Sequence, residues 1–187
     1  MKPAEFMDFL HILEKLKCNT RHGWTHTGRR ESVAEHTCRL ACMALLLEDE
    51  FPGLDMARVM RMCLIHDWGE AVTGDIPSFL KTEADEHSEL DAIHELTAKL
   101  PEIRPRLDAL YAEMEERRTP EARLYKALDR LEAVIQHNEA PLSTWLPLER
   151  ELNLTYGVED CAPFPFLREL RELVNEETRK KLAEEAQ

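Results

Sequence analysis

The stretch Cys63-Leu64-Ile65-His66-Asp67 places a histidine and an aspartate directly after an apolar run. Val59, Cys63 and His66 share one face of a helix, because side chains three and four residues apart are neighbours on a helix surface. An ionised aspartate carried to the end of such a core helix is costly unless something positive meets it. The stretch therefore predicts a buried helix whose end faces a cation.

A second amphipathic helix is predicted upstream. Ser32 followed by Glu35 has the spacing of a capping box and opens this helix, which runs toward Glu50. From His36, steps of four and eleven residues reach Leu40 and Leu47, so the imidazole lies on the apolar stripe. We therefore expect His36 to be buried.

The rest of the chain also has helical periodicity, and no alternating strand pattern of useful length occurs. Apart from the two helices above, the elements expected are a first helix ending near Lys17, a polar connection from Asn19 to Arg30, a loop at Gly74-Asp75-Ile76-Pro77, helices over Thr82–Leu100 and Leu107–Arg117, a helix after Thr119-Pro120 that carries Asp129, a short helix with Trp145 and Leu146, and a long C-terminal helix from Leu167 to Leu182. This pattern predicts an all-α fold.

The bulk composition is that of one soluble globular domain. The 187 residues are 43% hydrophobic and 33% charged, enough for a substantial core. We expect a single domain over 1–187, with a core at roughly 5–140 and the C-terminal helices 141–187 packed on it. A net charge of −13 argues against general binding to nucleic acid, although a local metal or a few arginines still permit a small anionic substrate.

The sequence also favours the cytoplasm. The longest apolar run, Leu40 to Leu47, is too short to span a bilayer, and the first residues do not lead into a signal-peptide core. Cys38, Cys42 and Cys63, among five cysteines, lie in apolar helical patterns and are interpreted as buried thiols of a reducing compartment. Cys38 and Cys42 could instead face one metal, but no second Cys or His pair at zinc-finger spacing accompanies them.

Four residues form a candidate metal site. His36, His66-Asp67 and Asp129 lie on three separate apolar-faced helices, the arrangement by which helical folds aim ligands into one cavity. A mixed set of imidazoles and carboxylates suits one divalent ion, and Co, Mn, Mg, Zn, Fe or Ni are not distinguished by sequence. The alternative is that both histidines are satisfied by backbone and that Asp129 pairs with an arginine, which leaves Asp67 without an account.

The order and spacing of these residues resemble the H…HD…D signature of the HD-domain metal-dependent phosphohydrolases. Ser32 to His36, His66-Asp67-Trp68-Gly69-Glu70 and Gly74 to Pro77 are similar to the branch that contains the YfbR-like 5′-deoxynucleotidases and their eukaryotic relatives. The similarity covers approximately residues 5 to 140. It implies an HD-domain helical bundle, the four ligands named above, a nucleotide substrate and a homodimer.

The resemblance also implies two catalytic carboxylates, Glu70 and Asp75. Glu70 falls one helical turn after His66, so the residue pattern independently allows it to reach the reacting water or the substrate. Asp75 depends on how its loop folds. Downstream, Glu132 and Gln136 lie either near the substrate or toward solvent.

Three residues are expected to bind the substrate. Arg21 resembles the family's arginine before the second helix, and its planar guanidinium suits bidentate contact with phosphate. Lys81, six residues after Asp75, has the family's spacing for a second cation. Trp24 either lines the sugar or base pocket or packs its loop onto the core. In the simplest deoxynucleotidases of the family the arginine and the tryptophan are adjacent, whereas here His22 and Gly23 separate Arg21 from Trp24.

The sequence thus predicts a divalent-metal-dependent 5′-nucleotidase that hydrolyses nucleoside 5′-monophosphates, the deoxyribonucleotides foremost. One alternative is an HD phosphohydrolase that acts on a phosphodiester or a nucleoside triphosphate. Another is a non-catalytic, metal-stabilised module that senses nucleotides. Such a module would not need additional carboxylates beside an open coordination position. A third is a helical interaction scaffold without metal.

Overall fold

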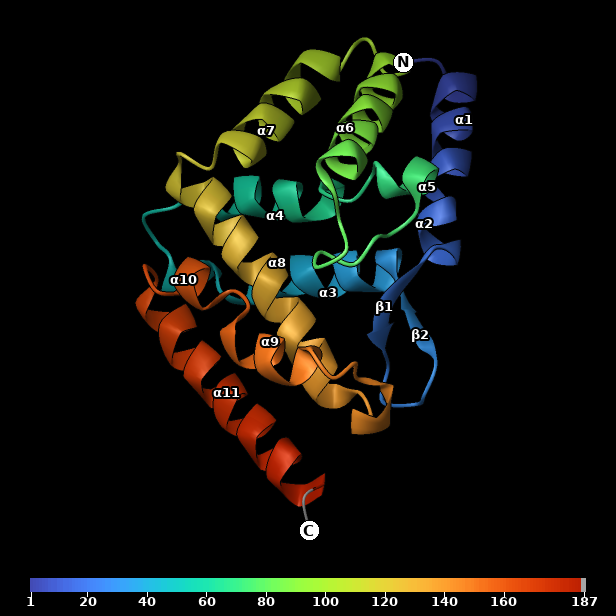
Figure 1. Ribbon diagram of the computed structural model, residues 1–187. Coiled ribbons are helices and arrows are strands. Elements are labelled where there is room, and N and C mark those ends of the chain that lie inside the picture. The colour runs from blue at the N-terminus through green and yellow to red at the C-terminus, as the bar shows by residue number, and fades with distance from the viewer. Residues whose placement is uncertain (186–187) are drawn as a thin grey trace.

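The computed structural model describes residues 1–185. It confirms the all-α class, with one small two-stranded sheet (Figure 1). The helices are α1 (Pro3–Leu13), α2 (Lys15–Cys18), α3 (Val33–Leu46), α4 (Met56–Ile65), α5 (Glu70–Thr73), α6 (Glu83–Ala98), α7 (Arg104–Glu116), α8 (Pro120–Glu139), α9 (Glu149–Thr155), α10 (Val158–Cys161) and α11 (Pro165–Glu185), with short 3-10 turns at Glu48–Glu50 and Leu142–Thr144.

Helix α8 organises the molecule. It packs against α3, α4 and α7 on one side and against α10 and α11 on the other, and Figure 1 shows it crossing α3 and α4. Leu124, Leu128 and Leu131 on α8 are fully buried, as is Leu40 on α3. One apolar cluster extends from Phe9 to Val174 and includes residues of α10 and α11, so these C-terminal helices share the core. The single domain over 1–187 stays a prediction. Residues 186–187 of that prediction lie outside the described residues.

The predicted helix starts are confirmed at their caps. The Ser32 side chain accepts a hydrogen bond from the Glu35 backbone N–H, and the Glu35 carboxylate accepts one from the Ser32 backbone N–H. These two hydrogen bonds complete the capping box. Asp55 caps α4 in the same way, through the N–H of Arg58. Because these caps fix where α3 and α4 begin, they also fix where His36 and His66 lie along them.

The polar connection between Asn19 and Arg30 is more ordered than the sequence indicated. It contains strand β1 (Thr20–Trp24), paired antiparallel with β2 (Arg30–Ser32), and the register is irregular between Thr20 and Trp24. Gly28, at φ +80°, supplies the left-handed residue of the turn. Neither strand is long enough to show an alternating pattern, so periodicity alone missed this hairpin.

The predicted short helix at Trp145 and Leu146 is wrong. The chain makes a 3-10 turn at Leu142–Thr144, Trp145 is extended with ψ 139°, and α9 starts only at Glu149. Pro147 favours a break at this point, because a proline disfavours the helical conformation of the residue before it, here Leu146. The apolar pair at 145–146 therefore belongs to a connection rather than to a helix.

The interpretation of the cysteines is correct only in part. Cys63 is buried, but Cys38 and Cys42 are exposed. Both lie two residues from the fully buried Leu40, and two residues correspond to about 200° around a helix, so they occupy the outer face of α3.

The length and hydrophobicity of a helix decide whether it can span a membrane. Within the part of the chain that the structure describes, no helix is both long enough and apolar enough to cross a bilayer.

Candidate metal centre and active site

The four predicted ligands converge on one point. His36 comes from α3, His66 ends α4 as its C-cap, Asp67 follows it, and Asp129 comes from α8. The Nε2 atoms of the two histidines are 3.2 Å apart, and His36 Nε2 is 3.2 Å from Asp129 Oδ1. Asp67 Oδ2 is 3.0 Å from His66 Nε2. Three helices therefore bring two nitrogens and two carboxylates within a few ångströms of each other.

The hydrogen bonds of the two imidazoles fit metal binding. His66 Nδ1 lies 2.8 Å from the carbonyl oxygen of Cys63, so Nδ1 carries the proton and donates it, which leaves Nε2 with a lone pair. His36 Nδ1 contacts the Glu132 carboxylate in the same manner. Both Nε2 atoms thus face each other and the carboxylates, an arrangement that requires a proton or a metal cation between them. The donor set is one that divalent ions use.

The electrostatics point the same way. Burial and Arg21 lower the pKa of His36, yet the nearby Glu132 and Asp129 carboxylates outweigh them and raise that pKa to about 9. Burial by itself would raise the pKa of Asp67, but His66, His36 and Arg21 hold it well below its usual range. Asp67 therefore stays ionised, and the cluster of His36, His66, Asp67 and Asp129 favours an added positive charge.

Glu132, whose place the sequence left open, contacts the candidate ligand His36. It is fully buried behind His36, where one carboxylate oxygen accepts the Nδ1–H of His36 and the other accepts a 2.6 Å hydrogen bond from Arg39 Nε. A carboxylate behind a ligating histidine fixes the ring orientation and raises the basicity of the ligating nitrogen. Glu132 thus faces neither the substrate nor solvent.

Glu132→Gln is expected to weaken metal binding by roughly 10- to 100-fold, because a neutral amide orients and polarises His36 less strongly than a carboxylate does. Titration calorimetry of chelator-stripped protein with Mn²⁺ measures the change. Glu139→Gln is the matched control, since Glu139 lies on the same helix and pairs with Arg39 at 2.6 Å but contacts no ligand. Equal affinities in the two variants would contradict the role of Glu132.

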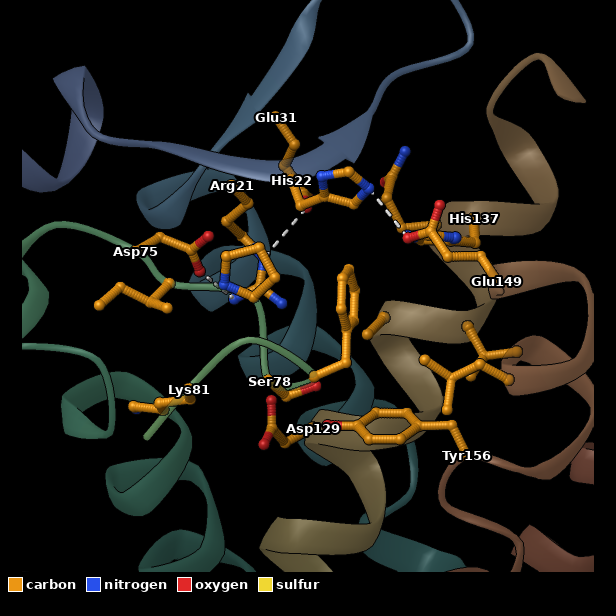
Figure 2. A pocket seen from close by; sticks show the side chains of 18 of the residues that line it. Arg21, His22, Glu31, Asp75, Ser78, Lys81, Asp129, His137, Glu149 and Tyr156 are labelled. Carbon is orange, nitrogen blue, oxygen red and sulfur yellow. Dashed lines mark ion pairs between the residues drawn. The ribbon is translucent and has the colours of Figure 1, made fainter. Parts of the chain in front are cut away.

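The metal site opens into a cavity of about 170 Å³ (Figure 2). Asp67 and Asp129 line one end of it, together with Arg21, Glu70 and Asp75. The structure therefore brings both predicted catalytic carboxylates and the predicted phosphate-binding arginine to the ligands.

Glu70 is buried in the first turn of α5, and its Oε2 has no hydrogen-bond partner among the described residues. Its carboxylate lies with those of Asp67 and Glu89 in a group whose oxygens are within 4.8 Å of one another. Burial, then the charges of Asp67 and Asp75, raises the pKa of Glu70 to about 10. A carboxyl group of this kind is suited to proton transfer, and a nearby divalent cation opposes the rise in its pKa.

Three cationic side chains border the same end of the cavity. Arg21, on β1, has Nη1 3.4 Å from Asp67 Oδ2 and 3.9 Å from Asp75 Oδ1. Lys81 lines the cavity and pairs with Glu89. Lys126 was missed by the sequence reasoning, and its Nζ lies 2.7 Å from Asp129 Oδ2. The sequence feature that could have identified Lys126 is its position three residues before Asp129, on the same helix face.

Trp24 is placed differently from the other predicted substrate-binding residues. It does not line the cavity, whereas its neighbours His22 and Gly23 do. The guanidinium of Arg30 stacks 4.4 Å above its ring, and its carbonyl oxygen accepts a 2.6 Å hydrogen bond from Gln136 Nε2. Trp24 thus ties the hairpin to α8.

The other end of the cavity contains polar groups that the sequence analysis did not predict. His137 on α8 and Glu149 on α9 face His22, and Figure 2 shows the three grouped together away from Asp129. Nothing in the local pattern marked Glu149, which lies 127 positions along the chain from its partner His22, at a distance of 2.9 Å.

The sequence matches the HD domain family model over residues 13–163. The human protein named 5′-deoxynucleotidase HDDC2 is 34% identical over 138 residues, which cover 71% of this chain and 67% of that one. The Schizosaccharomyces pombe protein named 5′-deoxynucleotidase hdd1 is 29% identical over 178 residues, which cover 90% of this chain and 83% of that one.

Solved structures agree with the sequence comparisons. A crystal structure from Magnetospirillum magnetotacticum, titled a predicted metal-dependent phosphohydrolase, superposes with a TM-score of 0.78 at 31% identity and covers 95% of each chain. A conserved hypothetical protein from Pyrococcus furiosus gives a TM-score of 0.70 at 32% identity over 92% of this chain and 99% of that one. With its ligand geometry, its helical fold and a family match over most of its length, this chain belongs to the HD domain family.

Proposed function

We propose that this protein is a divalent-metal-dependent 5′-nucleotidase that hydrolyses deoxynucleoside 5′-monophosphates to nucleoside and phosphate. The observation that carries the proposal is the position of Glu70. Its buried carboxyl group, whose Oε2 has no hydrogen-bond partner in the part of the chain that the structure describes, lines the same cavity as Asp67 and Asp129. A purely structural metal site would not need such a group. Relatives named 5′-deoxynucleotidases, at 29–36% identity, support the substrate class.

A divalent cation held by His36, His66, Asp67 and Asp129 would act as a Lewis acid toward the phosphoryl group and its attacking water. Arg21 would bind the phosphoryl oxygens, because its guanidinium already lies among carboxylates at the edge of the site and can exchange them for a phosphate. Lys81 and Lys126 would add positive charge where negative charge develops.

Two carboxyl groups would handle the protons. Glu70 would accept the proton of the attacking water. From its loop, Asp75 would orient Arg21 and, because burial raises its pKa, would donate a proton to the leaving nucleoside oxygen. The loop after α5 places Asp75 here, because Gly74 adopts φ +78° and turns the chain back toward β1.

The experiment that tests this proposal measures phosphate release from ribo- and deoxyribonucleoside 5′-monophosphates by chelator-stripped protein, with Co, Mn, Mg, Zn, Fe or Ni restored singly. We expect no release without metal and faster release from the deoxyribonucleotides. Release from a phosphodiester or a nucleoside triphosphate alone would replace the substrate class. If no ester releases phosphate although metal is bound, the nucleotide-sensing module is favoured.

We also propose that the protein works as a homodimer in the cytoplasm. The resemblance to the deoxynucleotidase branch supports the dimer, and exposed apolar side chains such as Leu45 and Leu46 on α3 leave room for an interface. Sedimentation equilibrium decides between one copy and two.

A further inference from the structure

The floor of the cavity is one face of α8. Lys126, Asp129, Ala133 and His137 follow each other at steps of three and four residues and all line the cavity. Eight residues of helix separate Asp129 from His137, which corresponds to about 12 Å along the axis. This span is comparable to the length of an extended nucleoside 5′-monophosphate. A nucleotide whose phosphate lies at the metal, as the proposed function requires, therefore places its base near His137.

Glu149 presents an incompletely satisfied acceptor at that end of the cavity. The residue is 1% exposed. Its Oε2 accepts a 2.5 Å hydrogen bond from the backbone N–H of Leu146. Its Oε1 lies 2.9 Å from His22 Nε2 and 3.6 Å from His137 Nε2. Among residues 1–185, neither Oε1 nor His22 Nε2 makes a hydrogen bond of good geometry, although both atoms are buried. A buried carboxylate oxygen left in this way is costly, and a ligand donor would remove the cost.

The neighbouring groups complement this acceptor. Burial lowers the pKa of His137, so at neutral pH its ring carries one N–H and one lone pair. The ring packs on Trp145, with centroids 5.5 Å apart. Phe79 meets His22 edge to face at 5.7 Å and also lines the cavity. An aromatic side chain beside hydrogen-bonding groups is the usual way in which proteins hold the flat face of a base.

We propose that Glu149 and His137 form a base-recognition subsite for nucleobases that present an amino group next to an unprotonated ring nitrogen, as adenine and cytosine do. Glu149 Oε1 accepts a hydrogen bond from the amino group, and the imidazole N–H of His137 donates to the ring nitrogen. Uracil and thymine present the reverse order, a carbonyl oxygen beside a ring N–H. Their carbonyl oxygen would face the carboxylate, which cannot donate.

The test compares dCMP with dUMP, because their bases differ only in the amino or carbonyl group at carbon 4 and the adjacent ring proton. We expect the wild-type kcat/KM for dCMP to exceed that for dUMP at least tenfold. Glu149→Gln should reduce this ratio at least tenfold, chiefly through KM, since an amide both accepts and donates. Glu151→Gln is the matched control, because Glu151 lies on the same helix, is exposed and does not line the cavity.

An equal fall in kcat/KM for both nucleotides in Glu149→Gln would assign Glu149 to folding alone and overturn the subsite. Unchanged kcat/KM values for both nucleotides would show that Glu149 does not contact the base and would also overturn the subsite. If Glu149→Gln does not fold, His137→Phe keeps the ring against Trp145 and removes the donor, and it should reduce the same ratio.

The failure of the subsite can be separated from the failure of the proposed function. If the wild-type protein hydrolyses no nucleotide, the same variants are titrated with deoxycytidine and deoxyuridine by calorimetry. Tighter binding of deoxycytidine, lost in Glu149→Gln, supports the subsite without any catalysis, and equal dissociation constants for the two nucleosides overturn it.

Discussion

Asp67→Ala is expected to lose bound metal and phosphate release together. Asp67 Oδ2 lies 3.0 Å from His66 Nε2 and 4.0 Å from His36 Nε2, so its removal takes one of two anionic ligands from the cluster. Asp129 is then the single carboxylate left in the set to offset the two charges of a divalent ion, and the same change frees Arg21 from its 3.4 Å contact with Asp67. Activity should fall to the level of the metal-stripped protein.

Metal content after dialysis, measured by plasma mass spectrometry, and phosphate release from a deoxynucleotide test this expectation in one preparation. Asp91→Ala is a suitable control, because Asp91 is exposed on α6. Retained metal with lost activity would move Asp67 from the ligand set to the catalytic groups. Retained activity would exclude Asp67 from the centre.

Glu70→Gln is expected to keep the metal and lose turnover by roughly 10²- to 10⁴-fold, the usual contribution of a positioned general base. The amide has the shape of the carboxyl group, so the packing of α5 is preserved, but it cannot take a proton. Glu70 differs from Asp67 in its affinity for a proton. The pairing of His66 with Asp67 holds the pKa of Asp67 well below its usual range, whereas the pKa of Glu70 is raised to about 10.

The decisive comparison for Glu70 is kcat against metal affinity. We expect a metal dissociation constant within a few fold of the wild type and a kcat that falls by the full factor, with Glu95→Gln on the exposed face of α6 as the control. Loss of metal in Glu70→Gln would make Glu70 a ligand. Full activity would remove it from the mechanism and leave Asp75 as the candidate base.

Local pattern alone was enough to place the ligands on their helices. The Ser32 and Asp55 caps set where α3 and α4 begin, and the apolar stripe of α3 carried His36 to 0% exposure. Such features depend on residues within two helical turns, and the energies of caps and of apolar periodicity are local. The resemblance of the four-ligand signature supplied the family, which the comparisons confirm.

Short or polar segments were harder to predict from pattern. The β1–β2 hairpin has strands of five and three residues, and Trp24 turned out to pack on Arg30 rather than line the cavity. The conformation of such a segment depends on the element that packs against it. For the hairpin this element is α8, because Gln136 donates a hydrogen bond to the Trp24 carbonyl oxygen.

The sequence by itself determined the helical class, the family signature and the faces that His36, His66 and Asp129 occupy, because helix periodicity is a local property. Only the tertiary structure decided which distant groups support them. Glu132 contacts His36 from 96 positions away, and Glu149 meets His22 across the cavity. Both are buried acids whose partners come from distant elements, α3 for Glu132 and β1 for Glu149, and a carboxylate is stable in the interior only where folding delivers its donors.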